Sequence, residues 1–168
     1  MSVGKTTLVN ALKKLPEFQS YNFATERSKY LSDLGIPLNT DSTLKGQTVF
    51  LAERCAELMH DNIITDRTII DVMSFTMNAR SIDQYDKEIF ENYAKEFIRE
   101  YDYIFYISSD GLSIEDNGVR ETDEHYRDVI DFTITSFIRK YAHMMKNVET
   151  IKGSTEERIE QILKFTNS

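Results

Sequence analysis

The segment SVGKTTL, residues 2–8, is the most informative stretch of the chain. It is the second half of the Walker A pattern G-x-x-x-x-G-K-[ST], in which a glycine-rich loop binds the phosphates of a nucleotide. Gly4 lets the backbone pass close to a phosphate group because it has no Cβ. Lys5 would reach the β- and γ-phosphates, and the hydroxyl of Thr6 would bind Mg²⁺. The residues expected to contact ATP are Val3, Gly4, Lys5, Thr6 and Thr7.

The Walker A pattern is incomplete in this sequence. Its first glycine would lie just before Met1. A GKT tripeptide alone also occurs at the start of ordinary surface helices. Here it opens directly into an amphipathic segment, with Leu8, Leu12 and Leu15 on one face. This context favours a phosphate-binding loop, with Lys5 as a catalytic residue.

Composition limits the class of protein. The chain has 168 residues, a formal net charge of −8 and one cysteine, Cys55. This length suggests one domain, residues 1–168. A single cysteine excludes an internal disulfide and a thiolate metal site, and it suits the reducing cytoplasm. The acidic pI of about 4.9 argues against duplex nucleic acid as a partner. No apolar run approaches the ~20 residues that span a bilayer. We therefore expect a cytoplasmic protein.

Strands and helices alternate along the sequence. Apolar and β-branched runs predict strands at residues 21–25, 62–66, 101–108 and 148–152. Helices are expected from Gly4, at 26–35, 43–60, 68–80, 84–100 and 122–145, and after the S-x-x-E capping box of Ser154 and Glu157. This alternation predicts an α/β domain of three layers with a mainly parallel sheet.

Three of these helices carry apolar residues at helical spacing. The first set, in helix 43–60, is Val49, Ala52, Ala56 and Met59. The second, in helix 84–100, is Ile89, Tyr93 and Phe97. The third, in the long helix 122–145, is Tyr126, Ile130, Ile134, Phe137, Tyr141 and Met145.

Four segments together resemble one enzyme superfamily. They are SVGKTTL at 2–8, ATERSKYL at 24–31, ITDRTIID at 64–71 and DNGVRETDEHYRDVID at 116–131. In this order they resemble the P-loop nucleoside and nucleotide kinases. The likeness is to predicted phage and bacterial ATPase-kinases related to nicotinamide-riboside kinase and, more distantly, to thymidylate kinase. It implies transfer of a phosphoryl group from ATP, with Mg²⁺, to a small acceptor. A nucleoside, a nucleoside monophosphate and nicotinamide riboside all remain open as acceptors.

The resemblance also implies that one strand is missing. In this superfamily the strand before the phosphate loop lies at the centre of the sheet, and too few residues precede Gly4 to form it. We expect the natural protein to continue upstream with that strand. In its absence, the strands at 62–66 and 101–108 would face each other across a gap of one strand width, with backbone groups unpaired.

Two acidic–basic pairs are the expected acceptor site. The resemblance places Glu26 and Arg27 at the end of the second strand, where Glu26 would act as a general base or Arg27 would bind an acceptor phosphate. It places Asp66 and Arg67 at the end of the third strand. Asp66 would hold Mg²⁺ or act on the acceptor, and Arg67 would bind acceptor oxygens. The structural alternatives are an exposed pair at a helix start for the first and a mutual salt bridge for the second.

The segment at about 111–128 resembles the lid of these kinases. Its arginines, Arg120 and Arg127, would close over the phosphates and stabilise charge on the transferring group. A solvated charged helix is the structural alternative, because acidic residues lie between them. Gly153 would lie against the adenine, although it also precedes a helix cap. The three histidines are spread over separate helices and suggest no metal site.

Two other functions compete with a small-molecule kinase. A P-loop ATPase or nucleotide-binding module would act through a partner protein, and a different kinase would act on DNA or a modified base. We find no N-K-x-D motif of GTPase switches. The paired lid arginines favour phosphoryl transfer, and the acidic pI argues against DNA. Association as a homodimer stays open.

Overall fold

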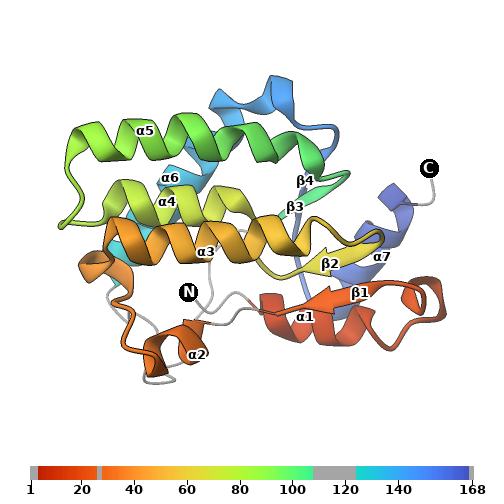
Figure 1. Ribbon diagram of the computed structural model, residues 1–168. Coiled ribbons are helices and arrows are strands. Elements are labelled where there is room, and N and C mark those ends of the chain that lie inside the picture. Colours follow the sequence, from red (N-terminus) through yellow and green to blue (C-terminus); the bar gives the residue numbers. More distant parts are fainter. Residues whose placement is uncertain (1–3, 26–27, 108–123, 167–168) are drawn as a thin grey trace.

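The computed structural model describes residues 4–25, 28–107 and 124–166, and helices and strands alternate through them (Figure 1). The strands are β1 Asn22–Ala24, β2 Ile63–Thr65, β3 Ile104–Ile107 and β4 Val148–Ile151. The α-helices are α1 Lys5–Leu12, α2 Ser28–Asp33, α3 Leu44–Glu57, α4 Ile69–Asn78, α5 Gln84–Ala94, α6 Glu124–Lys140 and α7 Thr155–Thr166. Short 3₁₀ helices are η1 Pro16–Phe18, η2 Asn39–Asp41, η3 Lys95–Glu100 and η4 Ala142–Met144.

Two pairs of parallel strands form the sheet layer. β1 pairs with β2, with Phe23 opposite Ile64, and β3 pairs with β4, with Tyr106 opposite Thr150. Within the described residues, no backbone hydrogen bond joins β2 to β3. The predicted parallel pairing is confirmed, and the two strands expected to flank a missing strand are not paired with each other. The upstream strand itself stays a prediction.

The strands separate two hydrophobic cores. Successive residues of a strand point to opposite faces. Ile104 of β3 therefore packs into a core with α3, α4, α5 and α6, whereas Phe105 packs into a second core with α1 and α7. Figure 1 shows α1 and α7 together on one side of the strands and α3, α4 and α5 on the other. This is the three-layer arrangement that the sequence predicts.

The long helix α6 buries the stripe expected of it. Tyr126, Ile130, Ile134 and Phe137 are at most 9% exposed, and Tyr141, just past the helix, is buried with them. Met145 packs against the same core and is partly buried. Within the described ranges, no helix combines the length and the apolar character that crossing a membrane requires.

On α5, two residues of the predicted apolar spacing lie on the outer face, whereas the third, Phe97 of η3, packs against the core. Ile89 and Tyr93 are 51% and 62% exposed. The buried apolar residues are Phe90 and Ala94, which lie one position further along the chain. Both sets have helical spacing, so periodicity cannot choose between them, and the neighbouring helices decide.

The same correction applies to α3. Ala52 and Ala56 are exposed, and Met59, just past the helix, is 85% exposed. The helix buries Leu51 together with the polar residues Gln47 and Arg54. Two long polar side chains on an inner face are uncommon, because a buried polar group needs a partner to offset its lost hydration.

Candidate active site

The phosphate loop enters α1 as the sequence predicts. Gly4 is the N-cap of α1 and has a left-handed backbone, with φ 74° and ψ 18°. A side chain at this φ would be strained, so glycine suits the position. The N–H of Leu8 donates to the carbonyl of Gly4 at 2.9 Å and closes the first turn. The N–H groups of Lys5, Thr6 and Thr7 therefore have no acceptor within the helix. They lie at its positive end, where an anion binds favourably.

A hydrogen bond connects this loop to the end of β2. The Thr6 hydroxyl donates to Asp66 Oδ2 at 2.9 Å, although the two residues are 60 positions apart in the chain. The backbone N–H of Asp66 donates to the carbonyl of Ala24 on β1 at 3.2 Å, which fixes the position of the carboxylate. The structure thus brings together the two residues predicted to bind metal, Thr6 and Asp66.

Asp66 is buried with unused hydrogen-bonding capacity. It is 4% exposed. Among the described residues, nothing donates a hydrogen bond to its other carboxylate oxygen, Oδ1. Burying a carboxylate oxygen without a partner is costly, so such an atom is available to a water molecule, an ion or a ligand. The carboxylate of Asp66 is therefore positioned to bind a cation or a donor group beside the phosphate loop.

The donor set fits Mg²⁺. The ion prefers hard oxygen ligands, and in nucleotide sites it is usually held by one or two protein groups together with phosphate oxygens and water. A hydroxyl and a carboxylate, from Thr6 and Asp66, match this pattern. In the part of the chain that the structure describes, no three His, Cys, Asp or Glu side chains cluster as a metal cage. The nucleotide would therefore have to complete the coordination.

Arg67 pairs with Asp71, not with Asp66. Its Nη1 lies 3.5 Å from Asp71 Oδ1, and its guanidinium lies over the Phe75 ring, 5.1 Å from the ring centre. Asp71 also accepts a hydrogen bond from the N–H of Thr68 at 2.8 Å, in the capping box of α4. The helix cap therefore holds Arg67, and the carboxylate of Asp66 accepts its hydrogen bond from Thr6.

A buried charged cluster behind this turn was not predicted. Arg54 of α3 is 3% exposed and pairs with Glu57 at 2.7 Å. The Tyr101 hydroxyl accepts a hydrogen bond from the N–H of Ile69 at 3.2 Å, at the start of α4. Burial raises the pKa of Tyr101, although the Ile69 bond and the charge of Arg54 act in the opposite direction. The Tyr101 bond anchors the start of α4, three residues after Asp66. No local sequence signal distinguishes Arg54 from a surface arginine.

Part of the predicted site cannot be placed. Val3, Glu26, Arg27 and Arg120 lie outside the described residues, as does most of the expected lid. Arg127 lies in the first turn of α6, with its side chain 16% exposed and its Nε 3.4 Å from Asp128 Oδ1. The roles assigned to these residues stay predictions.

The Gly153 turn begins the last helix. Gly153 has φ +91°, and a Cβ there would overlap the carboxylate of Glu157. The N–H of Ser154 donates to Glu157 Oε2 at 2.7 Å, and the N–H of Glu157 donates to Ser154 Oγ at 3.2 Å. The predicted capping box is confirmed, and its tight turn accounts for the glycine. Contact of Gly153 with adenine stays a prediction.

A second cationic residue at the phosphate loop was also not predicted. Arg158 of α7 is 8% exposed, and its Nη1 is 3.4 Å from the position that a Cβ on Gly4 would occupy. The two residues lie at opposite ends of the chain, so only the packing of α7 on α1 brings them together.

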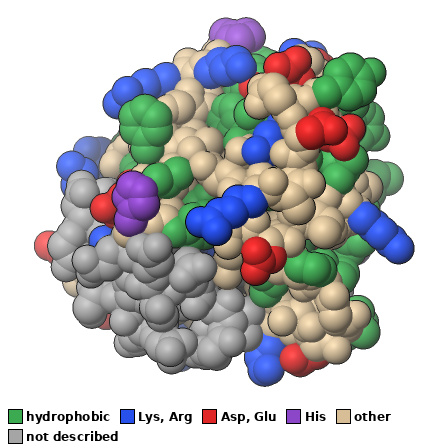
Figure 2. Space-filling model, turned by 90° about the vertical axis from the view of Figure 1, so that its left-hand side faces the viewer, with side chains coloured by type: hydrophobic (Ala, Val, Ile, Leu, Met, Phe, Trp, Pro, Cys, Tyr) green, Lys and Arg blue, Asp and Glu red, His purple; other side chains and the backbone are tan. Residues whose placement is uncertain are grey.

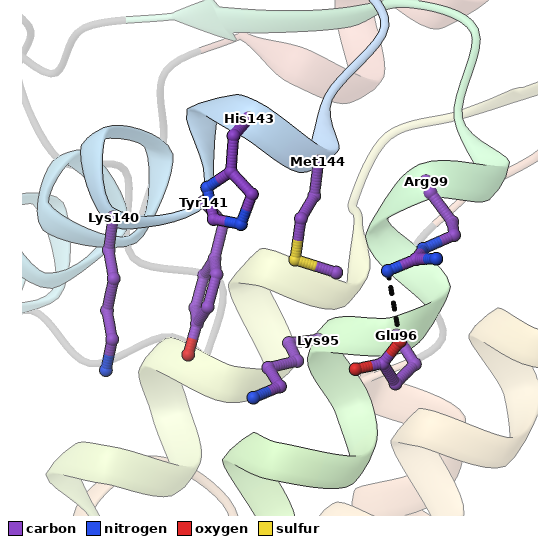
Figure 3. Close-up of a pocket in the computed structure, with 7 residues that line it drawn as sticks. All are labelled: Lys95, Glu96, Arg99, Lys140, Tyr141, His143 and Met144. Carbon is purple, nitrogen blue, oxygen red and sulfur yellow. Dashed lines mark ion pairs between the residues drawn. The ribbon is translucent and has the colours of Figure 1, made fainter.

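A separate basic cavity lies far from this loop in the fold. It has a volume of about 630 Å³ and lies between η3 and the end of α6 (Figure 3). Its lining residues are Lys95, Glu96, Arg99, Lys140, Tyr141, His143 and Met144. Acidic groups already compensate two of its cations. Lys140 Nζ lies 2.6 Å from Glu91 Oε1, and Arg99 Nη2 lies 3.1 Å from Glu96 Oε2.

The surface charges are mixed. On the face drawn in Figure 2, the described basic and acidic side chains are interspersed among hydrophobic ones and form no continuous basic stripe. A protein that binds duplex nucleic acid usually carries such a stripe. This face therefore gives no support to a kinase that acts on duplex DNA.

A family described as an AAA domain matches residues 1–158 of the chain. No curated protein matches the sequence.

Two solved structures share the fold over nearly their whole length. One is deoxyadenosine kinase from M. mycoides with bound dCTP, with a TM-score of 0.66 and 19% identity, covering 99% of this chain and 95% of that one. The other is the deoxyadenosine kinase from M. mycoides with the products dCMP and a flexible dCDP, with a TM-score of 0.61 and 18% identity, covering 98% and 93%. At these identities the likeness establishes the fold, which is that of a P-loop nucleoside or nucleotide kinase.

Proposed function

Because the chain belongs to the AAA domain family and has a P-loop kinase fold, we propose that it transfers a phosphoryl group from ATP to a small nucleoside- or nucleotide-like acceptor in the presence of Mg²⁺. The observation that carries this proposal is the hydrogen bond from Thr6 to the buried Asp66, directly beside Gly4 and Lys5. It brings a hydroxyl and a carboxylate together at the N-terminus of the helix that begins with Lys5.

The loop supplies positive charge where a nucleotide's phosphates would lie. The first-turn N–H groups of α1 and the ammonium group of Lys5 offset the charge of the β- and γ-phosphates. Phosphoryl transfer requires little covalent chemistry from a protein, so positioning and charge stabilisation account for most of the catalysis. Lys5 is therefore the residue on which activity should depend most.

Thr6 and Asp66 would hold Mg²⁺, which when bound neutralises charge on the β- and γ-phosphates. The bond between the two side chains orients the Thr6 oxygen and keeps Asp66 Oδ2 in place. The unused Oδ1 of Asp66 gives the site a second oxygen from the protein. This assignment leaves activation of the acceptor to another group.

That group is Glu26 if the acceptor is a hydroxyl. A hydroxyl has a high pKa and benefits from a general base, whereas an acceptor phosphate is already anionic and needs an arginine such as Arg27. Arg67 is held by Asp71 and Phe75 and would contact acceptor oxygens from that fixed position. The similarity to deoxyadenosine kinase favours a nucleoside hydroxyl.

The remaining residues would act on the donor. Arg127, together with Arg120, would stabilise charge on the transferring group when the lid closes. Gly153 would contact the adenine from the turn before α7. These assignments follow from the resemblance of their segments to the kinase superfamily.

A panel assay tests the function. Labelled ATP with Mg²⁺ is incubated with deoxynucleosides, ribonucleosides, nucleoside monophosphates, nicotinamide riboside and an oligonucleotide, and labelled products are separated. We expect transfer to a nucleoside or its monophosphate and to no oligonucleotide. Slow ATP hydrolysis without transfer to any acceptor would contradict the proposal and favour a nucleotide-binding module that acts through a protein partner.

A pair of variants then separates the acceptor chemistries. Glu26→Gln should lower kcat about 10²- to 10⁴-fold if the acceptor is a hydroxyl, which is the usual contribution of a general base. If the acceptor is a phosphate, Arg27→Ala should have the larger effect. Full turnover of a nucleoside by Glu26→Gln would remove Glu26 from the mechanism.

A further inference from the structure

The last helix brings a buried guanidinium to the phosphate loop. Arg158 lies in the first turn of α7, where its backbone N–H donates to the carbonyl of Ser154 at 3.0 Å. It is 8% exposed, and its Nη1 is 3.4 Å from the position of a Cβ on Gly4. The guanidinium therefore lies against the backbone of the loop. Figure 1 shows α7 beside α1, and the two helices contact each other.

Two sources of positive charge therefore meet at Gly4, the residue before Lys5. They are the N-terminus of α1 and Arg158. A guanidinium stays charged at all ordinary pH values, and its planar set of donors matches phosphate oxygens better than an ammonium group does. A guanidinium fixed beside the loop adds donors of constant charge there, which favours a multiply charged anion over a neutral molecule.

The contact also bears on the conformation of the loop. Gly4 holds a left-handed backbone at the point where the chain turns into α1. Packing a rigid planar group against that backbone limits the directions in which the loop can move. A preformed loop loses less conformational entropy when it binds phosphate.

We propose that Arg158 is a positioning residue of the nucleotide site, which braces the phosphate loop at Gly4 and strengthens the binding of the nucleotide's polyphosphate. This inference rests on the proposed function, in which the loop binds nucleotide phosphates. It assigns the last helix a part in nucleotide affinity in addition to its place in the core.

The test removes the charge of Arg158 and compares two ligands. Arg158→Met is compared with Arg158→Lys and with Arg139→Met, which removes the same charge from an exposed position on α6. Calorimetry gives Kd for ATP and for inorganic tripolyphosphate, both with Mg²⁺. We expect Arg158→Met to raise Kd for both ligands by about tenfold to a hundredfold, the usual effect of losing a contact to a charged group. Arg158→Lys should recover only part of the loss, because it keeps the charge without the planar group, and Arg139→Met should stay within about twofold of the parent protein.

Kinetics on the acceptor found by the panel assay give a second readout. KM for ATP should rise in Arg158→Met, whereas kcat and KM for the acceptor should change less than about threefold. A merely structural arginine would lower the folded fraction and reduce kcat without changing KM for ATP. If Arg158→Met does not fold, Arg158→Gln replaces it, because it keeps a polar side chain and loses the charge.

Three outcomes would overturn the inference. The first is unchanged Kd for ATP in both Arg158→Met and Arg158→Gln. The second is weaker ATP binding with unchanged tripolyphosphate binding, which would mean that Arg158 acts on the adenosine part of ATP and not on its phosphates. The third is an equal loss in Arg139→Met, which would make the effect one of net charge and not of the position of Arg158. If the parent protein binds neither ligand, the proposed function fails as well, and that result is distinct from all three.

Discussion

The phosphate loop and the basic cavity both carry cationic side chains, but they differ in the polar groups that surround those side chains. In the cavity, Lys140 and Arg99 lie against Glu91 and Glu96 of the same chain. At the loop, first-turn N–H groups point outward from α1, and Asp66 has a carboxylate oxygen to which no described residue donates. Local cation content is thus a poor guide to a phosphate site. Backbone donors at a helix N-terminus, beside a buried carboxylate oxygen to which no described residue donates, are a better one.

Lys5→Ala gives the largest contrast between the two regions. It should lower phosphoryl transfer about a thousandfold, because it removes a charge aimed at the transferring phosphate. Its melting temperature should stay close to that of the parent, since Lys5 lies outside both hydrophobic cores. Initial rates with saturating acceptor and a thermal melt measure the two effects.

Lys140→Met in the basic cavity is the control. It should keep full turnover and lower the melting temperature by about 1–3 °C, because the buried Glu91 loses a donor. Near-normal turnover in Lys5→Ala, or a large loss in Lys140→Met, would reverse the assignment of the two regions.

Asp66→Asn should have the next largest effect. An amide oxygen can still accept the Thr6 hydrogen bond, so the fold should be kept while the negative charge is lost. We expect kcat to fall about a hundredfold and the Mg²⁺ concentration for half-maximal rate to rise. A magnesium titration at fixed ATP measures this. The same Mg²⁺ dependence in the variant and the parent would exclude Asp66 from the metal site.

Gly4→Ala should have a moderate effect, and Gly35→Ala is its control. Both glycines have positive φ, 74° and 83°, so both substitutions introduce similar backbone strain, about 1 kcal/mol. Only the Cβ at position 4 meets another side chain, Arg158, whereas the one at position 35 meets nothing within 4 Å. Both variants should melt about 2–4 °C lower.

Only Gly4→Ala should also weaken the binding of ATP, by about tenfold in Kd, because the substitution disturbs the loop that binds phosphate. Calorimetry on both variants, at a temperature where each is folded, measures this. Equal ATP affinity in the two would mean that the shape of the loop at Gly4 does not matter for binding.

The smallest expected effect is a pH dependence in the basic cavity. The hydrogen bond to Glu91 raises the pKa of Lys140 above its ordinary value of 10.5. A group whose pKa is higher in the folded protein than in the unfolded chain stabilises the fold. That contribution is complete at pH values below the pKa of the unfolded chain, and it is lost as pH rises through the pKa of the folded protein. The difference in melting temperature between the parent and Lys140→Met should therefore be constant near neutral pH and shrink above about pH 10.5. A difference that grows at alkaline pH would contradict the assignment.

Much of the local structure was predictable because nearby residues determine it. The GKT motif predicted a helix that begins after Gly4, and Ser154 with Glu157 predicted the cap of α7. Asp66 was predicted at the end of a strand, since a carboxylate that follows a short apolar run marks the functional edge of a parallel sheet. Each of these signals lies within a few residues of the feature it predicts.

The choice of helix face was less predictable. α6 has one apolar stripe, and that stripe is buried. α5 has apolar residues on two faces, and the sequence pattern pointed to Ile89 and Tyr93, which are exposed. Periodicity gives the angle between side chains around a helix, but it does not say which side the next helix will cover.

By itself, the sequence determined the order of strands and helices, the phosphate loop and the acidic residue at the end of β2. Only the tertiary structure decided that Asp66 bonds Thr6 while Arg67 bonds Asp71, and that Arg158 lies against Gly4. The physical reason is the distance along the chain. Caps and turns form between neighbouring residues, whereas these partners meet only after the helices pack on the two faces of the strands, and that packing depends on the shape of the whole core.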